Sequence, residues 1–203
     1  MKKFTSRDLY ASIITGIITG FIAWKIIDYL KLYQLPGGYS LAWLVVIVPI
    51  LWIAGVNLGY YFGKQIDFFT RFGRFVAIGF TNTAVDFGVL YLLIAKYGPA
   101  TGIVFSSYKA ISFTVATVHS YLWNKYWTFD SGKTSGGGHE FLKFLSVTVV
   151  SLVINVVIAT LVLETGVSLG HDPKLWAGIA AIAGSAAALI FSFLGFKIIV
   201  FKK

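Results

Sequence analysis

The sequence predicts an all-α, polytopic membrane protein with six transmembrane helices. Its 203 residues are 57% hydrophobic and only 12% charged, about half the charged fraction of an ordinary soluble domain, and the mean hydropathy is +0.79. Six apolar runs are each long enough to cross a hydrocarbon core of about 30 Å at about 1.5 Å per helical residue. These observations exclude a soluble globular domain and a disordered chain.

The six predicted spans follow one another with short connections. They are Leu9–Leu30, Leu41–Gly63, Phe75–Ala95, Gly102–Trp123, Phe144–Leu163 and Leu175–Phe196. Proline and glycine mark turns, and they occur at residues 35–38, 97–99 and 171–173. The first run is too long for the apolar part of a signal peptide, and no small-residue cleavage site follows it, so we expect a retained helix.

Basic residues predict the orientation of the chain. With the amino terminus inside, twelve of the 17 Lys and Arg residues fall on the cytoplasmic side and four on the outer side, while Lys109 lies within a span. This bias predicts an N-in/C-in topology. Basic residues that flank apolar spans suit anionic membrane lipids, and because no DNA- or RNA-binding motif accompanies them, no nucleic-acid partner is expected.

An internal repeat divides the predicted helices. Residues 74–129 and 143–201 each open with a basic-aromatic pair, and each closes with a Lys-x-x-x-Phe segment on the same side. Both copies therefore run in the same direction, which implies a pseudo-two-fold axis along the membrane normal. The repeat predicts a duplicated four-helix domain over residues 71–203, preceded by an accessory transmembrane hairpin over residues 1–70.

Two ionisable residues, Asp86 and Lys109, lie well inside apolar spans. A charge in a bilayer costs at least about 2.5–3.5 kcal/mol, so each should have a partner or a wet cavity. Helical rise places both in the outer half of the membrane on consecutive antiparallel helices, where they can pair. Either a structural ion pair or a charged cavity for a polar or anionic substrate accounts for them.

Further candidate site residues are polar and close to the first repeat's inner end. Arg74 and Lys125 suit a lipid phosphate, although the aromatic segment that contains Lys125 equally suits simple anchoring at the interface. His119 has the chemistry to donate to a phosphate or to pack as a hydrogen-bonded histidine. Asn82 corresponds to Ser151 and Asp86 to Asn155. Either a polar site has been kept in one copy only, or the two copies have drifted apart since the duplication. The candidate substrate-binding residues are Arg74, Asn82, Asp86, Lys109, His119, Asn124 and Lys125.

Several kinds of chemistry are not expected. The sequence has no cysteine, and its three histidines lie in separate segments, so neither a metal site nor another cofactor is predicted. Gly132-Lys133-Thr134 lacks the upstream glycine of a phosphate-binding loop, since Trp127 stands at that position. No catalytic motif is present, and we expect a protein that is not an enzyme.

The chain resembles the GtrA-like family over residues 71–201. The resemblance rests on Arg74-Phe75, Gly79, Asn82-Thr83 and Asp86 in one helix, and on Asn124-Lys125-Tyr126-Trp127-Thr128-Phe129 at the close of the next. It implies a small prokaryotic membrane protein of cell-surface polysaccharide and teichoic-acid glycosylation, of a kind proposed to flip polyprenyl-phosphate-linked sugars. The second copy departs from the pattern at Phe196-Lys197, and the first two helices lie outside the family core.

Three functions follow as hypotheses. The first is translocation of a polyprenyl-phosphate-linked monosaccharide across the cytoplasmic membrane, with sugar transfer left to a separate membrane glycosyltransferase. The alternative is a non-transporting scaffold that recruits or anchors a glycosyltransferase. A third is an ion-coupled exporter of small cations, against which the positive charge of Lys109 counts. Because a four-helix core is small for a transport path, we expect a homo-oligomer.

Overall fold

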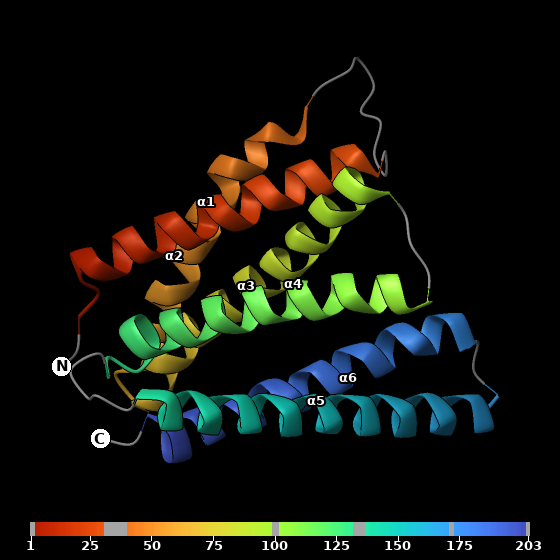
Figure 1. The fold of residues 1–203 in the computed structure, drawn as a ribbon. Coiled ribbons are helices and arrows are strands. Elements are labelled where there is room, and N and C mark those ends of the chain that lie inside the picture. The colour runs from red at the N-terminus through yellow and green to blue at the C-terminus, as the bar shows by residue number, and fades with distance from the viewer. Residues whose placement is uncertain (1–2, 31–39, 99–101, 132–136, 171–172, 202–203) are drawn as a thin grey trace. The chain divides into compact units, whose positions relative to one another are not determined.

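The computed structural model describes residues 3–30, 40–98, 102–131, 137–170 and 173–201, and within these ranges every regular element is a helix. Each of the six predicted apolar segments lies in a helix (Figure 1). The elements are α1 (Ser6–Tyr29), η1 (Leu41–Trp43), α2 (Leu44–Phe62), α3 (Phe68–Tyr97), α4 (Gly102–Trp123), η2 (Asn124–Thr128), α5 (Gly137–Ser168), α6 (Pro173–Gly195) and η3 (Phe196–Val200). The predicted turns at 35–38, 97–99 and 171–173 fall wholly or partly outside the described residues.

Helix length and hydropathy support membrane insertion. Among the described residues, Ser6–Tyr29, Leu41–Phe62 and Phe68–Tyr97 are long and apolar enough to cross a bilayer. With 30 residues, α3 is about 45 Å long and exceeds the hydrocarbon core by several turns. The chain is thus a helical membrane protein, whereas the count of six spans and the N-in/C-in orientation stay predictions.

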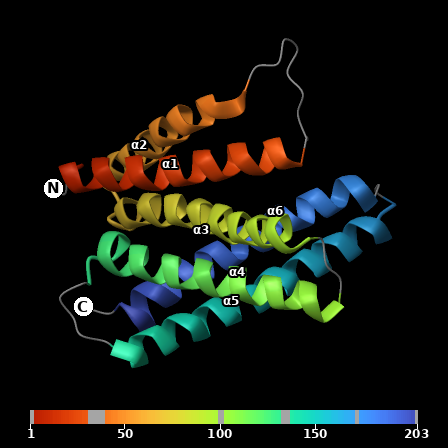
Figure 2. The same cartoon turned by 45° about the horizontal axis from the view of Figure 1, so that its top comes forward.

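The chain divides into two compact units, residues 1–130 and 131–203. The first contains α1 to α4 and η2, and the second contains α5, α6 and η3. In the second unit, α5 and α6 run side by side along their length (Figure 1). In the first, α1 and α2 both pack against α3 (Figure 2), so the hairpin and the first repeat copy share one unit. The predicted boundary between residues 70 and 71 stays a prediction.

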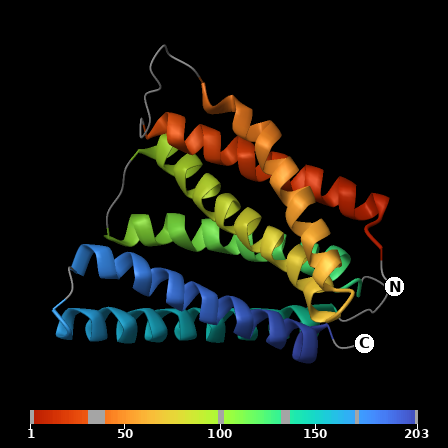
Figure 3. The same cartoon turned by 180° about the vertical axis from the view of Figure 1, so that it is seen from behind.

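Close backbone contact explains two glycines of α1. A Cβ atom on Gly16 would lie 2.4 Å from the Pro49 Cα, and one on Gly20 would lie 2.3 Å from the Leu44 carbonyl oxygen. Only glycine allows α1 and α2 to cross at this distance (Figure 3). Gly16 and Gly20, four residues apart, therefore serve contact between two helices of the same chain.

A buried polar junction joins α1 and α2 to α3. The Thr81 hydroxyl donates to the Ala77 carbonyl at 2.8 Å and accepts bonds from Thr19 at 3.0 Å and the Trp52 indole at 3.3 Å. Thr81 is fully buried. Since an unpaired hydroxyl would be costly in an apolar interior, these bonds fix the register of the three helices.

Both repeat copies close in the same way. The π-helical turns η2 and η3 end where the Phe129 amide donates to the Asn124 carbonyl at 2.9 Å and the Phe201 amide donates to the Phe196 carbonyl at 2.8 Å. In the second copy, the Phe144 and Phe196 rings stack with centroids 4.3 Å apart. The first copy has Asn124 where the second has Phe196, so the two closures share a backbone and differ in polarity.

Candidate functional site

A buried carboxylate, Asp8, lies at the start of α1. Thr5 caps the helix, and its backbone and hydroxyl groups donate to Asp8 Oδ2 at 3.0 and 2.7 Å. Tyr60 from α2 donates to the same oxygen at 2.9 Å, and the indole of Trp127 donates to Oδ1 at 3.0 Å. The side chain of Asp8 is only 1% exposed, so these donors replace water around its charge.

The guanidinium of Arg74 supplies the countercharge. Its Nε lies 2.8 Å from Asp8 Oδ1. One terminal nitrogen donates to the Trp127 carbonyl at 3.2 Å, and the other donates to the Tyr60 hydroxyl. Four elements (α1, α2, α3 and η2) thus meet at one ion pair, which we call the Asp8–Arg74 cluster: Asp8, Tyr60, Arg74 and Trp127.

The Asp8–Arg74 cluster limits how Arg74 could bind the lipid phosphate that the sequence predicts for it. Its side chain is 16% exposed and its charge is already offset by Asp8. A phosphate can bind Arg74 only by sharing it with, or displacing, a carboxylate that five protein groups hold in place. Arg74 is therefore not a free cation, and phosphate capture by it stays a prediction.

The neighbouring residues Asn124 and Lys125 are buried in η2. The Asn124 amide donates to the Ser120 carbonyl at 2.9 Å, while its buried Oδ1 atom has no hydrogen-bond partner in the described part of the chain. The Lys125 ammonium donates to the Tyr121 hydroxyl at 3.2 Å. Burial places Lys125 within the protein, where a simple interfacial anchor would not lie.

Asp86 contacts α4 as the sequence predicts, through a hydroxyl. Ser112 is fully buried and donates to Asp86 Oδ1 at 2.6 Å. The Lys109 position lies one helical turn before Ser112 and so shares its face, but the Lys109 side chain lies outside the described residues. The predicted Asp86–Lys109 ion pair stays a prediction.

Two further predicted residues, Asn82 and His119, carry buried polar atoms that have no hydrogen-bond partner among the described residues. These atoms are Asn82 Oδ1 and both ring nitrogens of His119. Asn82 lies one turn before Asp86 on α3, and His119 lies two turns after Ser112 on α4. Asn82 therefore shares a helix face with Asp86, and His119 shares one with Ser112. The Asp86–Ser112 hydrogen bond brings these two faces together. Among the described residues, other buried unpaired side-chain oxygens belong to Ser12, Asn124 and Thr128.

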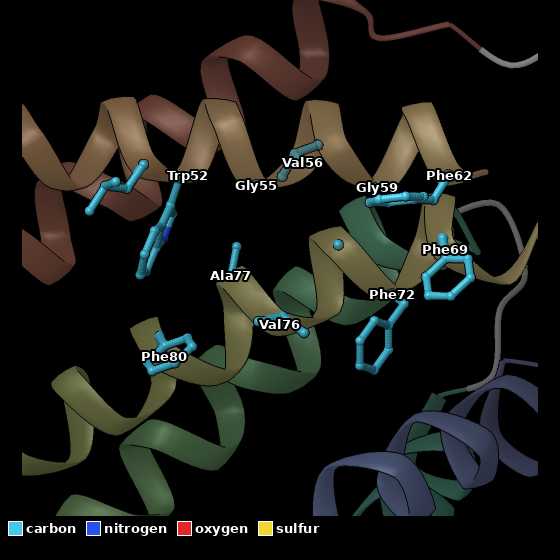
Figure 4. A pocket seen from close by; sticks show the side chains of 12 residues that line it. Trp52, Gly55, Val56, Gly59, Phe62, Phe69, Phe72, Val76, Ala77 and Phe80 are labelled. Atoms are coloured by element: carbon cyan, nitrogen blue, oxygen red, sulfur yellow. The ribbon is translucent and has the colours of Figure 1, made fainter. Parts of the chain in front are cut away.

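An apolar groove of about 300 Å³ runs between α2 and α3. Figure 4 shows aromatic side chains from both helices around it, among them Trp52, Phe72 and Phe80. Gly59 meets the backbone of Gly73 closely, whereas a Cβ on Gly55 would meet nothing within 4 Å. The two helices therefore approach at Gly59 and leave an open apolar surface at Gly55.

Asp8, Tyr60 and Thr81 are site residues that were not predicted from the sequence. Thr5-x-x-Asp8 has the spacing of a capping box, which identifies Asp8 as a cap but gives no sign of its ion pair. Tyr60 and Thr81 are ordinary residues of apolar helices, and only the tertiary contacts reveal their hydrogen bonds.

The fold and the site define a helical membrane protein in which Asn82, Asp86, Ser112 and His119 form a polar column along α3 and α4. Residues 74–201 match the GtrA/DPMS transmembrane domain, and the chain belongs to that family. It is 32% identical over 132 residues to the uncharacterized membrane protein YngA of Bacillus subtilis (strain 168), covering 64% of this chain and 78% of that protein. No solved structure matches it. The match begins at Arg74, so α1 and α2, which supply Asp8 and Tyr60, precede the family domain.

Proposed function

We propose that this protein moves a polyprenyl-phosphate-linked monosaccharide across the cytoplasmic membrane of a prokaryote, for cell-surface polysaccharide or teichoic-acid glycosylation. Its family membership supports a role in the handling of glycosyl lipids. The observation that carries the proposal is the set of buried, unpaired polar atoms on α3, α4 and η2, at Asn82, His119 and Asn124.

Unpaired polar atoms are costly to bury. Each one costs about 1–3 kcal/mol when it lacks a hydrogen-bond partner, and an apolar side chain in its place would avoid that cost. A sugar offers hydroxyl groups that both donate and accept hydrogen bonds, which suits amide oxygens and imidazole nitrogens alike. A polar column along α3 and α4 fits a sugar headgroup, while the prenyl tail stays in lipid.

The phosphate would meet Lys125 and Arg74 at one end of this column. Because Asp8 already offsets the charge of Arg74, phosphate binding there exchanges one anion for another. Asp86 and Lys109 would contact the sugar deeper in the membrane. In this proposal the chain spans the membrane six times with both termini inside, works as a homo-oligomer, and leaves sugar transfer to a membrane glycosyltransferase.

The test is transport by the purified protein in liposomes. A fluorescent polyprenyl-phosphate sugar in one leaflet should reach the other without any enzyme present, and Asp86→Asn and Lys109→Ala should each lower the rate at least tenfold. Thr83→Val, an exposed change on the same helix, should leave the rate unchanged. Equal rates in liposomes with and without the protein would refute transport.

A scaffold that recruits a glycosyltransferase is the second candidate, and the groove between α2 and α3 favours it. The groove is apolar and rimmed by aromatic rings, and Gly55 leaves room for another transmembrane helix. A scaffold requires the groove and not the polar column. If Gly55→Trp abolishes glycosylation in cells while Asp86→Asn does not, the scaffold is the better account.

A further inference from the structure

A second cavity lies at the end of the first unit where α1 begins and α2 ends. Its volume is about 710 Å³. It is lined by Lys3, Phe4, Ala54, Asn57, Leu58, Tyr60, Tyr61 and Lys64. No carboxylate lines it, and within the described part of the chain neither lysine forms an ion pair. The cavity is therefore positive at its polar end.

The lining of this cavity changes from apolar to basic along α2. Ala54, Leu58 and Tyr61 follow one another at intervals of three or four residues and so share a helix face. The Leu58 and Tyr61 side chains are 56% and 63% exposed, which suits contact with a lipid chain. Lys64 continues this face at the helix end, with its ammonium 5.6 Å from the Tyr61 ring centre.

Asn57 adds a neutral polar group within the apolar stretch, three residues after Ala54 and seven before Lys64. Its amide donates to the Ile53 carbonyl at 2.8 Å, so the Oδ1 atom is the part of the side chain that serves as an acceptor. The cavity thus combines two cations at its polar end with a largely apolar wall along α2, in the order of a phospholipid's phosphate and acyl chain.

From this arrangement we propose that the cavity binds an anionic glycerophospholipid. Lys3 and Lys64 bind the phosphate, and the acyl chain follows Leu58 and Ala54 along α2. The site does not depend on the proposed transport, because it uses neither the polar column nor the family domain. Tyr60 lines this cavity and also bonds to Asp8 and Arg74, so a bound lipid would abut the Asp8–Arg74 cluster.

The test uses the purified full chain in a neutral detergent, titrated with phosphatidylglycerol. Retained lipid is counted by native mass spectrometry, and the thermal midpoint is followed in parallel. Since each basic residue near an anionic lipid strengthens binding about fivefold, Lys3→Gln/Lys64→Gln should weaken phosphatidylglycerol binding roughly 30-fold. Asn57→Asp, which puts a negative charge in the cavity, should weaken it as well. Both variants should keep the lipid-free thermal midpoint and helicity, because all three side chains are exposed.

The matched control is Lys25→Gln/Lys96→Gln, which removes two positive charges from other places on the hairpin and α3. Lys25 lies over the Trp24 ring at 3.9 Å and lines a different cavity that also contains Asp28. This control should bind phosphatidylglycerol as the unchanged chain does, and phosphatidylcholine should bind the unchanged chain at least tenfold more weakly. Equal losses in the two double variants, equal binding of the two lipids, or the same thermal shift with inorganic phosphate alone would each overturn the proposal.

Discussion

Asp8 Oδ1 lies 2.8 Å from Arg74 Nε, and this contact ties the N-terminal hairpin to the first residue of the family domain. The carboxylate is 1% exposed, so most of its stabilisation comes from protein groups. Tyr60 and Trp127 each form hydrogen bonds with both Asp8 and Arg74. The hairpin is thus an electrostatic part of the domain, and its removal would leave Arg74 without its counterion.

We expect Asp8→Asn to destabilise the protein by about 3–5 kcal/mol, because it leaves Arg74 as an uncompensated and largely buried charge. The measurement is the thermal midpoint in detergent. Asp130→Asn is the matched control, since Asp130 also forms an ion pair with an arginine, Arg7, at 2.7 Å but is 60% exposed. An exposed pair contributes about 0–1 kcal/mol, so the control should change little. Equal losses from the two variants would contradict this account.

A double variant separates the ion pair from the other contacts of Asp8. Asp8→Asn/Arg74→Gln removes both charges, and we expect it to be more stable than the sum of the two single losses predicts. The interaction free energy from such a cycle should exceed about 1 kcal/mol. Strict additivity would show that the two charges do not stabilise each other.

Glycine contacts predict opposite effects of the same substitution at two positions. Gly16→Ala places a methyl group 2.4 Å from the Pro49 Cα, so it should force α1 from α2 and cost about 1–3 kcal/mol. Gly55→Ala meets nothing within 4 Å and should stabilise the helix by up to about 1 kcal/mol. Thermal midpoints of both variants test this pair. If Gly55→Ala lowered stability as much as Gly16→Ala, the crossing of α1 and α2 would not depend on the close contact between Gly16 and Pro49.

The sequence was a good guide to the helices and a poor one to their contacts. Apolar run length placed every helix to within several residues, and both Lys-x-x-x-Phe segments form π-helical turns capped by Phe129 and Phe201. Gly16 and Gly20 have the four-residue spacing that is typical of a helix contact, but that spacing does not show that Pro49 and Leu44 face them. Period and composition describe one helix at a time, so they cannot identify its partner.

The candidate site shows the same limit. Asp86 was predicted from its charge in an apolar run, and its contact with α4 followed from the antiparallel hairpin, but the bonding residue is Ser112. Arg74 was predicted to bind a lipid phosphate, and its counterion, Asp8, was not foreseen because it lies far away in the sequence and looks like an ordinary helix cap. Long-range ion pairs leave no periodic signal in a sequence.

The polar column predicts a conflict between stability and transport. Asn82→Leu and His119→Leu replace unpaired buried atoms with apolar groups, so each should raise the free energy of unfolding by about 1 kcal/mol. Each should also lower sugar-lipid transport in liposomes at least tenfold. The measurements are thermal midpoints and leaflet transfer on the same preparations. Variants that lose stability instead would show that the two residues serve packing.

The predicted topology can be tested by accessibility, because the chain contains no cysteine and single cysteines can be introduced without background. Tyr97, at the end of α3, is 62% exposed, and Leu169, just after α5, is 69% exposed. With six spans and both termini inside, these two positions lie outside, while the exposed residue His139 near the start of α5 lies inside. A membrane-impermeant maleimide added to intact cells should label Tyr97→Cys and Leu169→Cys but not His139→Cys.

Inverted membrane vesicles should reverse this pattern, and the unchanged chain should remain unlabelled in both preparations. The comparison of Tyr97→Cys with His139→Cys tests whether α4 crosses the membrane, since only α4 and the segment after it separate the two positions. The comparison of His139→Cys with Leu169→Cys tests α5 in the same way. If two neighbouring positions are labelled from the same side, the helix between them does not cross the membrane. That result would contradict the six-span topology and the transport path that the polar column requires.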